Sequence, residues 1–166
     1  MIAEVMRDLG VQVILEPGRV IAGNAGVLLT TVLYDKDAPD RIFLIVDAGM
    51  NDLMRPALYG AHHDIQPVAE PAPDASRKTY DVVGPICEST DKFAAGREMP
   101  EAQPGDLLAF MSAGAYGAVL SSAYNTRPLV PEVLVTGERY DVVRRRPDFD
   151  EMVALEEVPD WLSRTD

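Results

Sequence analysis

The chain has 166 residues, a formal net charge of −12 and a pI near 4.5, with 47% hydrophobic and 25% charged residues. This composition is that of a folded globular protein and excludes a disordered one. The acidic balance argues against nucleic acid and anionic membrane surfaces as partners, because both require clustered Lys and Arg.

The predicted cellular setting rests on three features. The single cysteine excludes an internal disulfide, which fits a reducing compartment. No apolar run approaches the roughly 20 residues of a membrane span. The first residues have no basic region ahead of an apolar one, as a signal peptide would. We therefore expect a cytoplasmic protein without a membrane segment.

The first predicted elements form a βα unit. Residues 11–16 are a nearly continuous apolar run, typical of a strand buried on both faces of a parallel sheet. Residues 19–33 predict a helix whose small residues suggest close packing on a neighbour, although its β-branched end from Val27 could already be strand. A parallel strand needs parallel neighbours, and we find none in this sequence. We therefore expect residues 1–33 to be the last strand and helix of a larger α/β barrel, with an apolar surface that drives association.

The rest of the chain predicts short strands separated by turns. Strands are expected at residues 41–47, 65–71, 78–84 and 107–111, with a hairpin of residues 131–136 and 138–145 across Gly137. Helical segments are expected at residues 55–59, 118–124 and 149–158, the last capped by Asp148 or Asp150, and loops at 48–54 and 91–101. This pattern predicts a mainly β fold, with a β-barrel or sandwich at residues 34–166 joined to the barrel remnant.

Residues 16–19, Glu16-Pro17-Gly18-Arg19, are the first candidate site. A buried strand that turns into a helix leaves N–H groups pointing outward at the positive end of the helix dipole, which favours an anion. Arg19 adds a guanidinium that can hold a carboxylate or phosphate through two hydrogen bonds. The alternative for this motif alone is an ordinary strand, turn and helix with a solvated arginine.

Residues 47–63 carry a second candidate site. If residues 55–59 are helical, Arg55 and Tyr59 lie on one face and can converge on a carboxylate. His62 and His63 invite a metal interpretation. Adjacent histidines project in different directions, however, and no third ligand stands at a suitable spacing, so no metal site is predicted.

Two further stretches place reactive groups on turns. Residues 84–91, GPICESTD, hold the only cysteine together with two carboxylates and two hydroxyls. Packing gives no reason for that density, although Cys87 could still be a small buried hydrophobe. In residues 111–117, MSAGAYG, glycines on both sides of Tyr116 would leave its ring uncovered. The alternative is a tight corner with a buried tyrosine.

The chain resembles the C-terminal part of the diaminopimelate decarboxylases in four motifs that occur in the family's order. They are EPGR at 16–19, DAGMNDLMRPALYGAHH at 47–63, GPICESTD at 84–91 and MSAGAYG at 111–117. This family depends on pyridoxal phosphate and has the fold of alanine racemase and ornithine decarboxylase. The resemblance runs from about residue 11 to 130. It implies conversion of meso-diaminopimelate to L-lysine and CO2, the last step of lysine biosynthesis.

The resemblance also implies two sets of binding residues. The residues implied to bind the cofactor are Glu16, Pro17, Gly18, Arg19 and Tyr116. The residues implied to bind the substrate are Arg19, Arg55, Tyr59, Glu88 and Tyr116.

Within these sets the resemblance gives individual roles. Cys87 would protonate the substrate carbon after CO2 leaves, and Glu88 would receive the distal ammonium group. The residue chemistry agrees, since diaminopimelate carries two carboxylates and two ammonium groups, and Arg19, Arg55 and Glu88 supply two cations and one anion. The family also implies a homodimer in which the Cys87–Glu88 segment of one subunit completes the site of the other.

The chain departs from the family at the lysine that carries the cofactor. None of Lys36, Lys78 and Lys92 stands in the matching context, and the barrel segments that hold the cofactor have no counterpart here. We therefore expect the chain to be inactive alone. The alternatives are a non-enzymatic β-domain for dimerisation or regulation, and a related decarboxylase of ornithine, arginine or carboxynorspermidine.

Overall fold

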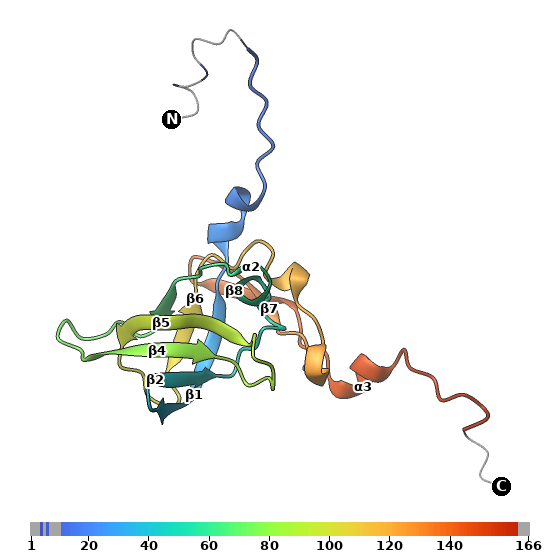
Figure 1. Ribbon diagram of the computed structural model, residues 1–166. Coiled ribbons are helices and arrows are strands. Elements are labelled where there is room, and N and C mark those ends of the chain that lie inside the picture. Colours follow the sequence, from blue (N-terminus) through green and yellow to red (C-terminus); the bar gives the residue numbers. More distant parts are fainter. Residues whose placement is uncertain (1–3, 5, 7–10, 163–166) are drawn as a thin grey trace.

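The computed structural model describes residues 4, 6 and 11–162, and its main feature is a six-stranded sheet (Figure 1). Its strands are β1 (Leu28–Ala38), β2 (Arg41–Val46), β3 (Ile65–Pro67), β4 (Arg77–Val83), β5 (Lys92–Pro100) and β6 (Leu107–Phe110). The sheet order is β3-β6-β1-β2-β4-β5, and every neighbouring pair is antiparallel except the parallel pair β2 and β4. The edge strands β3 and β5 contact each other, so the sheet curls into a nearly closed barrel. The predicted mainly β fold is confirmed.

Apolar side chains from every wall fill the barrel. The fully buried ones include Val32, Leu44, Val46, Tyr80, Val82, Leu108 and Phe110. The rings of Phe93 and Phe110 lie with centroids 4.4 Å apart. The hydroxyl of Tyr80 accepts the N–H of Ala102 at 3.4 Å, so this buried polar group has a partner. The predicted strands at residues 41–47, 78–84 and 107–111 are confirmed with small shifts at their ends, and the one at 65–71 is shorter.

The N-terminal βα unit is not formed, so both of its predicted elements were wrong. Residues 11–18 form no strand, and two 3₁₀ turns, η1 (Arg19–Ile21) and η2 (Gly23–Ala25), stand where the helix was expected. The β-branched residues that follow belong to β1, which pairs with both β2 and β6. Strand β1 crosses the predicted domain boundary between residues 33 and 34. The division into a barrel remnant and a sheet domain stays a prediction, and part of residues 1–33 lies outside the described residues.

The small residues at positions 22–26 seat this segment against the loop that follows β6. A Cβ on Gly114 would stand 2.1 Å from the carbonyl oxygen of Ala22, so only glycine fits there. The N–H groups of Ala113 and Gly114 donate to the carbonyls of Gly26 (2.8 Å) and Gly23 (3.0 Å). The expected close packing is therefore confirmed, although the helix is not.

Strand β5 was predicted to be a loop, and that prediction was wrong. Its sequence is polar because only a few of its residues, such as Phe93 and Met99, point into the core. Its pairing with β4 is irregular, and Gly96, at φ +59°, lies between the two paired stretches. These irregularities break the alternation that identifies a half-buried strand in sequence.

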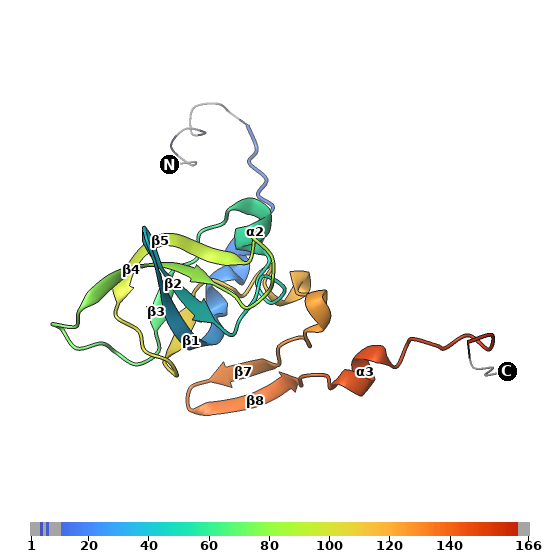
Figure 2. The same cartoon turned by 60° about the horizontal axis from the view of Figure 1, so that its bottom comes forward.

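The C-terminal part leaves the barrel. Figure 2 shows the hairpin of β7 (Glu132–Thr136) and β8 (Arg139–Arg144) apart from the six-stranded sheet, with α3 (Phe149–Val153) beyond it. The hairpin is confirmed, and α3 begins where predicted and ends earlier. Helix α2 (Arg55–Tyr59) is also confirmed, whereas η3 (Ala118–Leu120) and η4 (Tyr124–Thr126) replace the single helix expected at 118–124. Among the described residues no helix is long and apolar enough to cross a membrane.

Candidate active site

Three connecting segments carry the candidate residues, and the sheet topology brings them to one end of the barrel. Strands β2 and β4 are parallel, and β6 runs in the same direction because β1 is antiparallel to both β2 and β6. The loops at residues 47–54, 84–91 and 111–127 therefore leave the same end. The chain also enters β1 at this end, since Leu28 pairs with Phe110.

Helix α2 presents Arg55 to a buried histidine. Nη1 of Arg55 lies 3.0 Å from Nε2 of His63, and Nδ1 of His63 lies 2.8 Å from the carbonyl oxygen of Met111. A carbonyl only accepts and a guanidinium only donates, so Nδ1 carries the proton and Nε2 accepts from Arg55. His63 is 2% exposed. Burial is the main reason that the pKa of His63 lies below 6.5. The bond to Met111 acts in the opposite direction, and the positive charges of Arg55 and Arg19 lower the pKa further.

Arg19 reaches the same place from η1. Its Nη2 donates to the carbonyl oxygen of Ser112 at 2.9 Å, and the Ser112 hydroxyl donates to Oδ1 of Asn24 at 2.7 Å. The Nε of Arg19 is buried and has no partner. In the described part of the chain, neither Arg19 nor Arg55 pairs with a carboxylate. The arginine cluster, Arg19, Arg55 and His63, therefore has N–H donors left for an anion.

Cys87 lies exposed on the turn of residues 84–91, the cysteine turn, which is built on the buried Asp91. The two carboxylate oxygens of Asp91 accept the N–H groups of Met50 and Ile86, each at 2.7 Å. Burial raises the pKa of Asp91, and these two bonds oppose the shift. Asp91 therefore fixes the cysteine turn against the loop that leads to α2.

Glu88 contacts the third loop. The hydroxyl of Tyr124 donates to Oε2 of Glu88 at 3.4 Å. Arg127, just beyond η4, donates to Oδ1 of Asn51 at 3.0 Å and to the carbonyl oxygen of Asp47 at 2.6 Å. The three loops thus hold one another. No hydrogen bond among the described residues joins the arginine cluster to Cys87 or Glu88.

The remaining predicted site residues are exposed. Tyr59 lies one turn after Arg55 on α2 and is 65% exposed. Tyr116 is 50% exposed and has φ 58°, a conformation uncommon outside glycine. Residues 16–18 lie exposed on the segment that leads away from the barrel (Figure 1). The structure therefore gathers Arg19 and Arg55 around His63 and places Glu88 beside Tyr124.

Sequence reasoning missed the groups that support these residues. His63 was considered only as a metal ligand, and among the described residues no three His, Cys, Asp or Glu side chains are grouped to hold a metal ion. The apolar Ile65 two residues later, which is buried too, was the available signal that His63 faces inward. Tyr124 and Arg127 gave no signal, because their partners lie 36 and 76 residues away.

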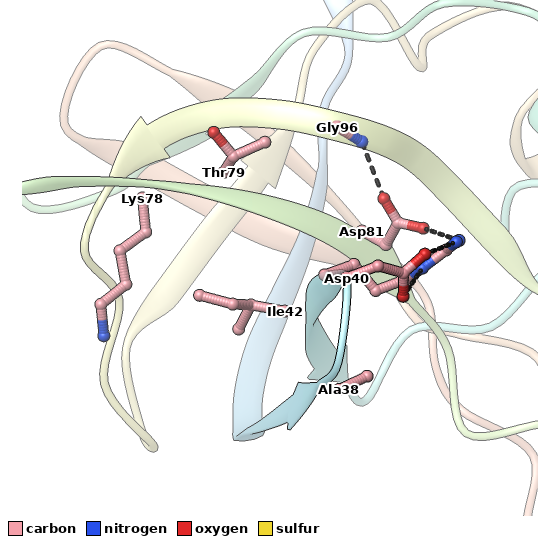
Figure 3. A pocket seen from close by; sticks show the side chains of 8 residues that line it. Ala38, Asp40, Ile42, Lys78, Thr79, Asp81 and Gly96 are labelled. Atoms are coloured by element: carbon pink, nitrogen blue, oxygen red, sulfur yellow. Dashed lines mark hydrogen bonds and ion pairs between the residues drawn. The ribbon is translucent and has the colours of Figure 1, made fainter.

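A hollow at the opposite end of the barrel is a separate feature (Figure 3). Arg41, at the β1–β2 turn, donates to Asp40 at 2.6 Å and to Asp81 at 3.3 Å, and Asp81 also accepts the N–H of Gly96 at 2.8 Å. Lys78 at its rim pairs with Glu101. The charged side chains that line this hollow are therefore paired with one another or with Glu101, unlike the two arginines of the arginine cluster.

Comparison with known proteins identifies the family. The family described as "Pyridoxal-dependent decarboxylase, C-terminal sheet domain" matches residues 10–114. The chain belongs to this family. The match covers the barrel up to the loop after β6 and includes the arginine cluster and the cysteine turn. The predicted resemblance to pyridoxal-dependent decarboxylases is thereby confirmed.

The relatives of this decarboxylase sheet domain are longer proteins. The chain is 54% identical over 150 residues to the diaminopimelate decarboxylase of Pseudomonas aeruginosa, covering 90% of the chain and 35% of that relative. It is 44% identical over 162 residues to that of Zymomonas mobilis, covering 98% of the chain and 38% of the relative. The crystal structure of the Helicobacter pylori enzyme complexed with L-lysine matches with a TM-score of 0.79 and 40% identity, over 93% of this chain and 38% of that one. The chain thus spans just over a third of these relatives.

Proposed function

We propose that the chain is the substrate-recognition and proton-donor part of a diaminopimelate decarboxylase, which converts meso-diaminopimelate to L-lysine and CO2. The observation that carries this proposal is the arginine cluster. Arg55 donates to the neutral His63, and Arg19 donates to the carbonyl oxygen of Ser112, next to the Met111 carbonyl that binds the same imidazole. Among the described residues neither arginine pairs with a carboxylate, and both lie at the barrel end that also carries the cysteine turn. The named relatives act as support, since each is a diaminopimelate decarboxylase.

The proposed substrate fits the charges of this barrel end. Arg19 and Arg55 would bind substrate carboxylates through forked hydrogen bonds, and the exposed phenol of Tyr59 adds a donor on the same helix as Arg55. The carboxylate of Glu88, held by Tyr124, would receive the distal ammonium group. A substrate with both a distal carboxylate and a distal ammonium uses all of these groups. Ornithine, which lacks the distal carboxylate, uses fewer.

Cys87 is the proposed proton donor. Its thiol is exposed on the cysteine turn beside Glu88, and the anchoring of that turn by Asp91 fixes its position. A positioned thiol can deliver a proton to the substrate carbon once CO2 has left. The proposal gives Cys87 this single step.

The chain also offers groups that fit the phosphate of pyridoxal phosphate. The buried Nε of Arg19 has no partner, and open space surrounds Gly18, so an anion can approach the Glu16–Arg19 segment. Tyr116 would lie against the cofactor with its uncovered ring. When bound, the cofactor supplies the electron sink for decarboxylation. The lysine that carries it would come from outside this chain, because Lys36, Lys78 and Lys92 do not match it in context.

Exposure of the site residues suggests what completes the site. Cys87, Tyr59 and Tyr116 are open to solvent, whereas such chemistry proceeds in a site that excludes water. We propose that the remaining walls come from a barrel domain and from the second subunit of a homodimer.

The alternative is a domain that serves only in assembly. The exposed hairpin of β7 and β8 favours association, but assembly alone would not explain the arginine cluster. A cytoplasmic location stays a prediction.

A chimaeric enzyme tests the proposal. The chain would replace the matching 150-residue segment of the Pseudomonas aeruginosa relative, and the purified protein would be assayed with meso-diaminopimelate and pyridoxal phosphate. We expect release of CO2 and L-lysine, loss of this activity on Cys87→Ala or Glu88→Ala, and none from the 166-residue chain alone. Glu98→Ala, which removes a surface partner of Arg77, is the control and should keep full activity. A folded, cofactor-loaded chimaera that acts on ornithine or arginine and not on diaminopimelate would refute the proposal.

A further inference from the structure

We propose that His63 is a positioning residue that holds the guanidinium of Arg55 ready for a substrate carboxylate. This inference rests on the proposed function and adds a residue to the binding site. His63 does not itself contact the substrate in this proposal. It acts through the bond that its Nε2 accepts from Arg55.

The local fold explains how two residues eight positions apart meet. Helix α2 ends at Gly60, whose left-handed conformation (φ 61°) turns the chain back. The N–H groups of Gly60 and Ala61 donate to the carbonyls of Pro56 and Arg55, which closes this turn. After this turn the chain brings the His63 ring to 3.0 Å from the guanidinium of Arg55.

The imidazole is fixed to the rigid wall of the barrel. Its Nδ1–H donates to the carbonyl oxygen of Met111, and the N–H of Met111 donates to the backbone carbonyl oxygen of Asp64 at 2.8 Å. The next residues, Ile65 and Phe110, pair as neighbours in β3 and β6. Arginine has a long flexible side chain whose ordering costs entropy. A rigid acceptor already in place lowers that cost before substrate arrives.

A neutral acceptor suits this purpose better than a carboxylate. An Asp or Glu at this position would order Arg55 equally well, but it would also neutralise the guanidinium and compete with the substrate. Nε2 of His63 accepts a single N–H. It leaves the charge and the remaining donors of Arg55 for an anion. Burial and the neighbouring charges of Arg19 and Arg55 keep the ring neutral.

His62 offers a matched comparison. It is exposed, its Nε2 lies 3.0 Å from Oδ1 of Asp64, and its ring contacts Arg97. It therefore belongs to a surface network with Asp64 and Arg97, and no hydrogen bond among the described residues joins it to Arg55. Arg97 also donates to the backbone carbonyl oxygen of His63 at 3.2 Å. Replacing His62 changes the same residue type one position away and removes no bond of the Arg55 or His63 side chains.

Two substitutions of His63 separate positioning from structure. In the chimaeric enzyme, His63→Asn keeps a donor near Met111 but loses the acceptor for Arg55, whereas His63→Gln keeps an acceptor near the Nε2 position but loses the donor. We expect His63→Asn to raise KM for meso-diaminopimelate about tenfold, as for the loss of one bond to a charged group, with a smaller change in kcat. We expect His63→Gln to stay within about threefold of the parent KM and His62→Asn to leave KM unchanged. In an Arg55→Ala background, His63→Asn should raise KM no further.

Other outcomes would overturn the inference. They are a parent-like KM for His63→Asn, a loss for His63→Gln as large as for His63→Asn, or the full extra loss in the Arg55→Ala background. An inactive parent chimaera would count against the proposed function instead. In that event the imidazole ¹⁵N shifts of the 166-residue chain decide the inference. Protonation at Nδ1 and an Nε2 signal that moves on Arg55→Ala are expected, and protonation at Nε2 would exclude the bond to Arg55.

Discussion

The barrel and the two arms that leave it contain the same kinds of apolar residue, with opposite fates. In the barrel those that point inward are buried, such as Leu44 at 0% exposed, and only a few strand residues such as Leu29 and Leu107 are exposed. In the N-terminal arm, residues 11–21, and the C-terminal arm, residues 132–162, they are exposed; Leu134 is 64% exposed. The exposed residues are Val11, Val13, Ile14, Leu15, Val20 and Ile21 in the first arm, and Val133, Leu134, Val135, Tyr140, Val142, Val143, Phe149, Leu155, Val158, Trp161 and Leu162 in the second.

The difference shows which part of the chain completes its own core. The barrel closes through the contact of β3 with β5, so its inward side chains cover one another. Each arm leaves that enclosure, and no described segment covers its apolar side chains (Figure 2). Apolar surface on this scale marks a place of contact with other protein. The arms are therefore suited to packing against what lies outside this chain.

The candidate site lies where these two regions meet. Arg55, His63 and the cysteine turn are fixed by hydrogen bonds to the barrel and its loops. Arg19 reaches the barrel only at its tip, through Ser112, while residues 16–18 belong to the N-terminal arm. Among the proposed substrate-binding groups, Arg55 and Glu88 are thus held by bonds within the barrel and its loops. The proposed phosphate-binding groups, Glu16 to Arg19, lie in the N-terminal arm, so their positions depend on contacts that order this arm.

The largest expected effect comes from making one change in both regions. Leu44→Ala removes a fully buried side chain and should lower the free energy of unfolding by about 2–5 kcal/mol. Leu134→Ala makes the same chemical change on the exposed hairpin and should stay within about 0.5 kcal/mol. Urea unfolding of the 166-residue chain, followed by circular dichroism, measures both. Equal losses would mean that the hairpin is covered in solution and that the contrast between barrel and arm is wrong.

A medium effect is expected from two glycines that differ in their surroundings. A Cβ on Gly84 would lie 2.4 Å from Oδ2 of Asp91, so Gly84→Ala must displace the carboxylate on which the cysteine turn is built. We expect a loss of about 1–3 kcal/mol in unfolding free energy, as for other overpacked sites. Gly18→Ala, in the N-terminal arm, meets nothing within 4 Å and is the control, with no measurable loss. A neutral Gly84→Ala in the same urea assay would contradict the role given to Asp91.

Sequence patterns predicted the parts of this architecture that local chemistry determines. The alternating strand at 41–47 and the turn at Gly137 depend on a few adjacent residues, and the Asp148 cap depends on a side chain three residues from its donor. The four motifs gave the family, which the comparison confirms, whereas the roles that they imply for Arg19, Arg55, Cys87 and Glu88 stay predictions. These are the features that a local pattern or a known motif can carry.

Contacts distant in sequence decided the rest. The run at 11–16 has the composition of a buried strand, but no described strand lies beside it, and composition cannot supply a partner. Strand β5 forms because β4 offers it a ladder, despite its polar residues. Arg127 lies 76 residues from its partner Asn51. No short-range pattern could reveal such a pair.

The smallest expected effect tests whether the C-terminal arm folds independently of the barrel. The Asp148 carboxylate accepts the N–H of Glu151, and the Glu151 carboxylate accepts the N–H of Asp148, which together cap α3. Asp148→Ala removes half of this box and should weaken the helix by about 1 kcal/mol. Because α3 has no buried residue and lies beyond the hairpin, the loss should remain local. Amide exchange should quicken at Glu151 and Met152 and stay unchanged at Leu44, with an unaltered unfolding midpoint.

The control is Asp150→Ala, which changes the first turn of α3 outside the capping box and should change amide exchange less. A lowered midpoint for Asp148→Ala would show that arm and barrel unfold as one unit.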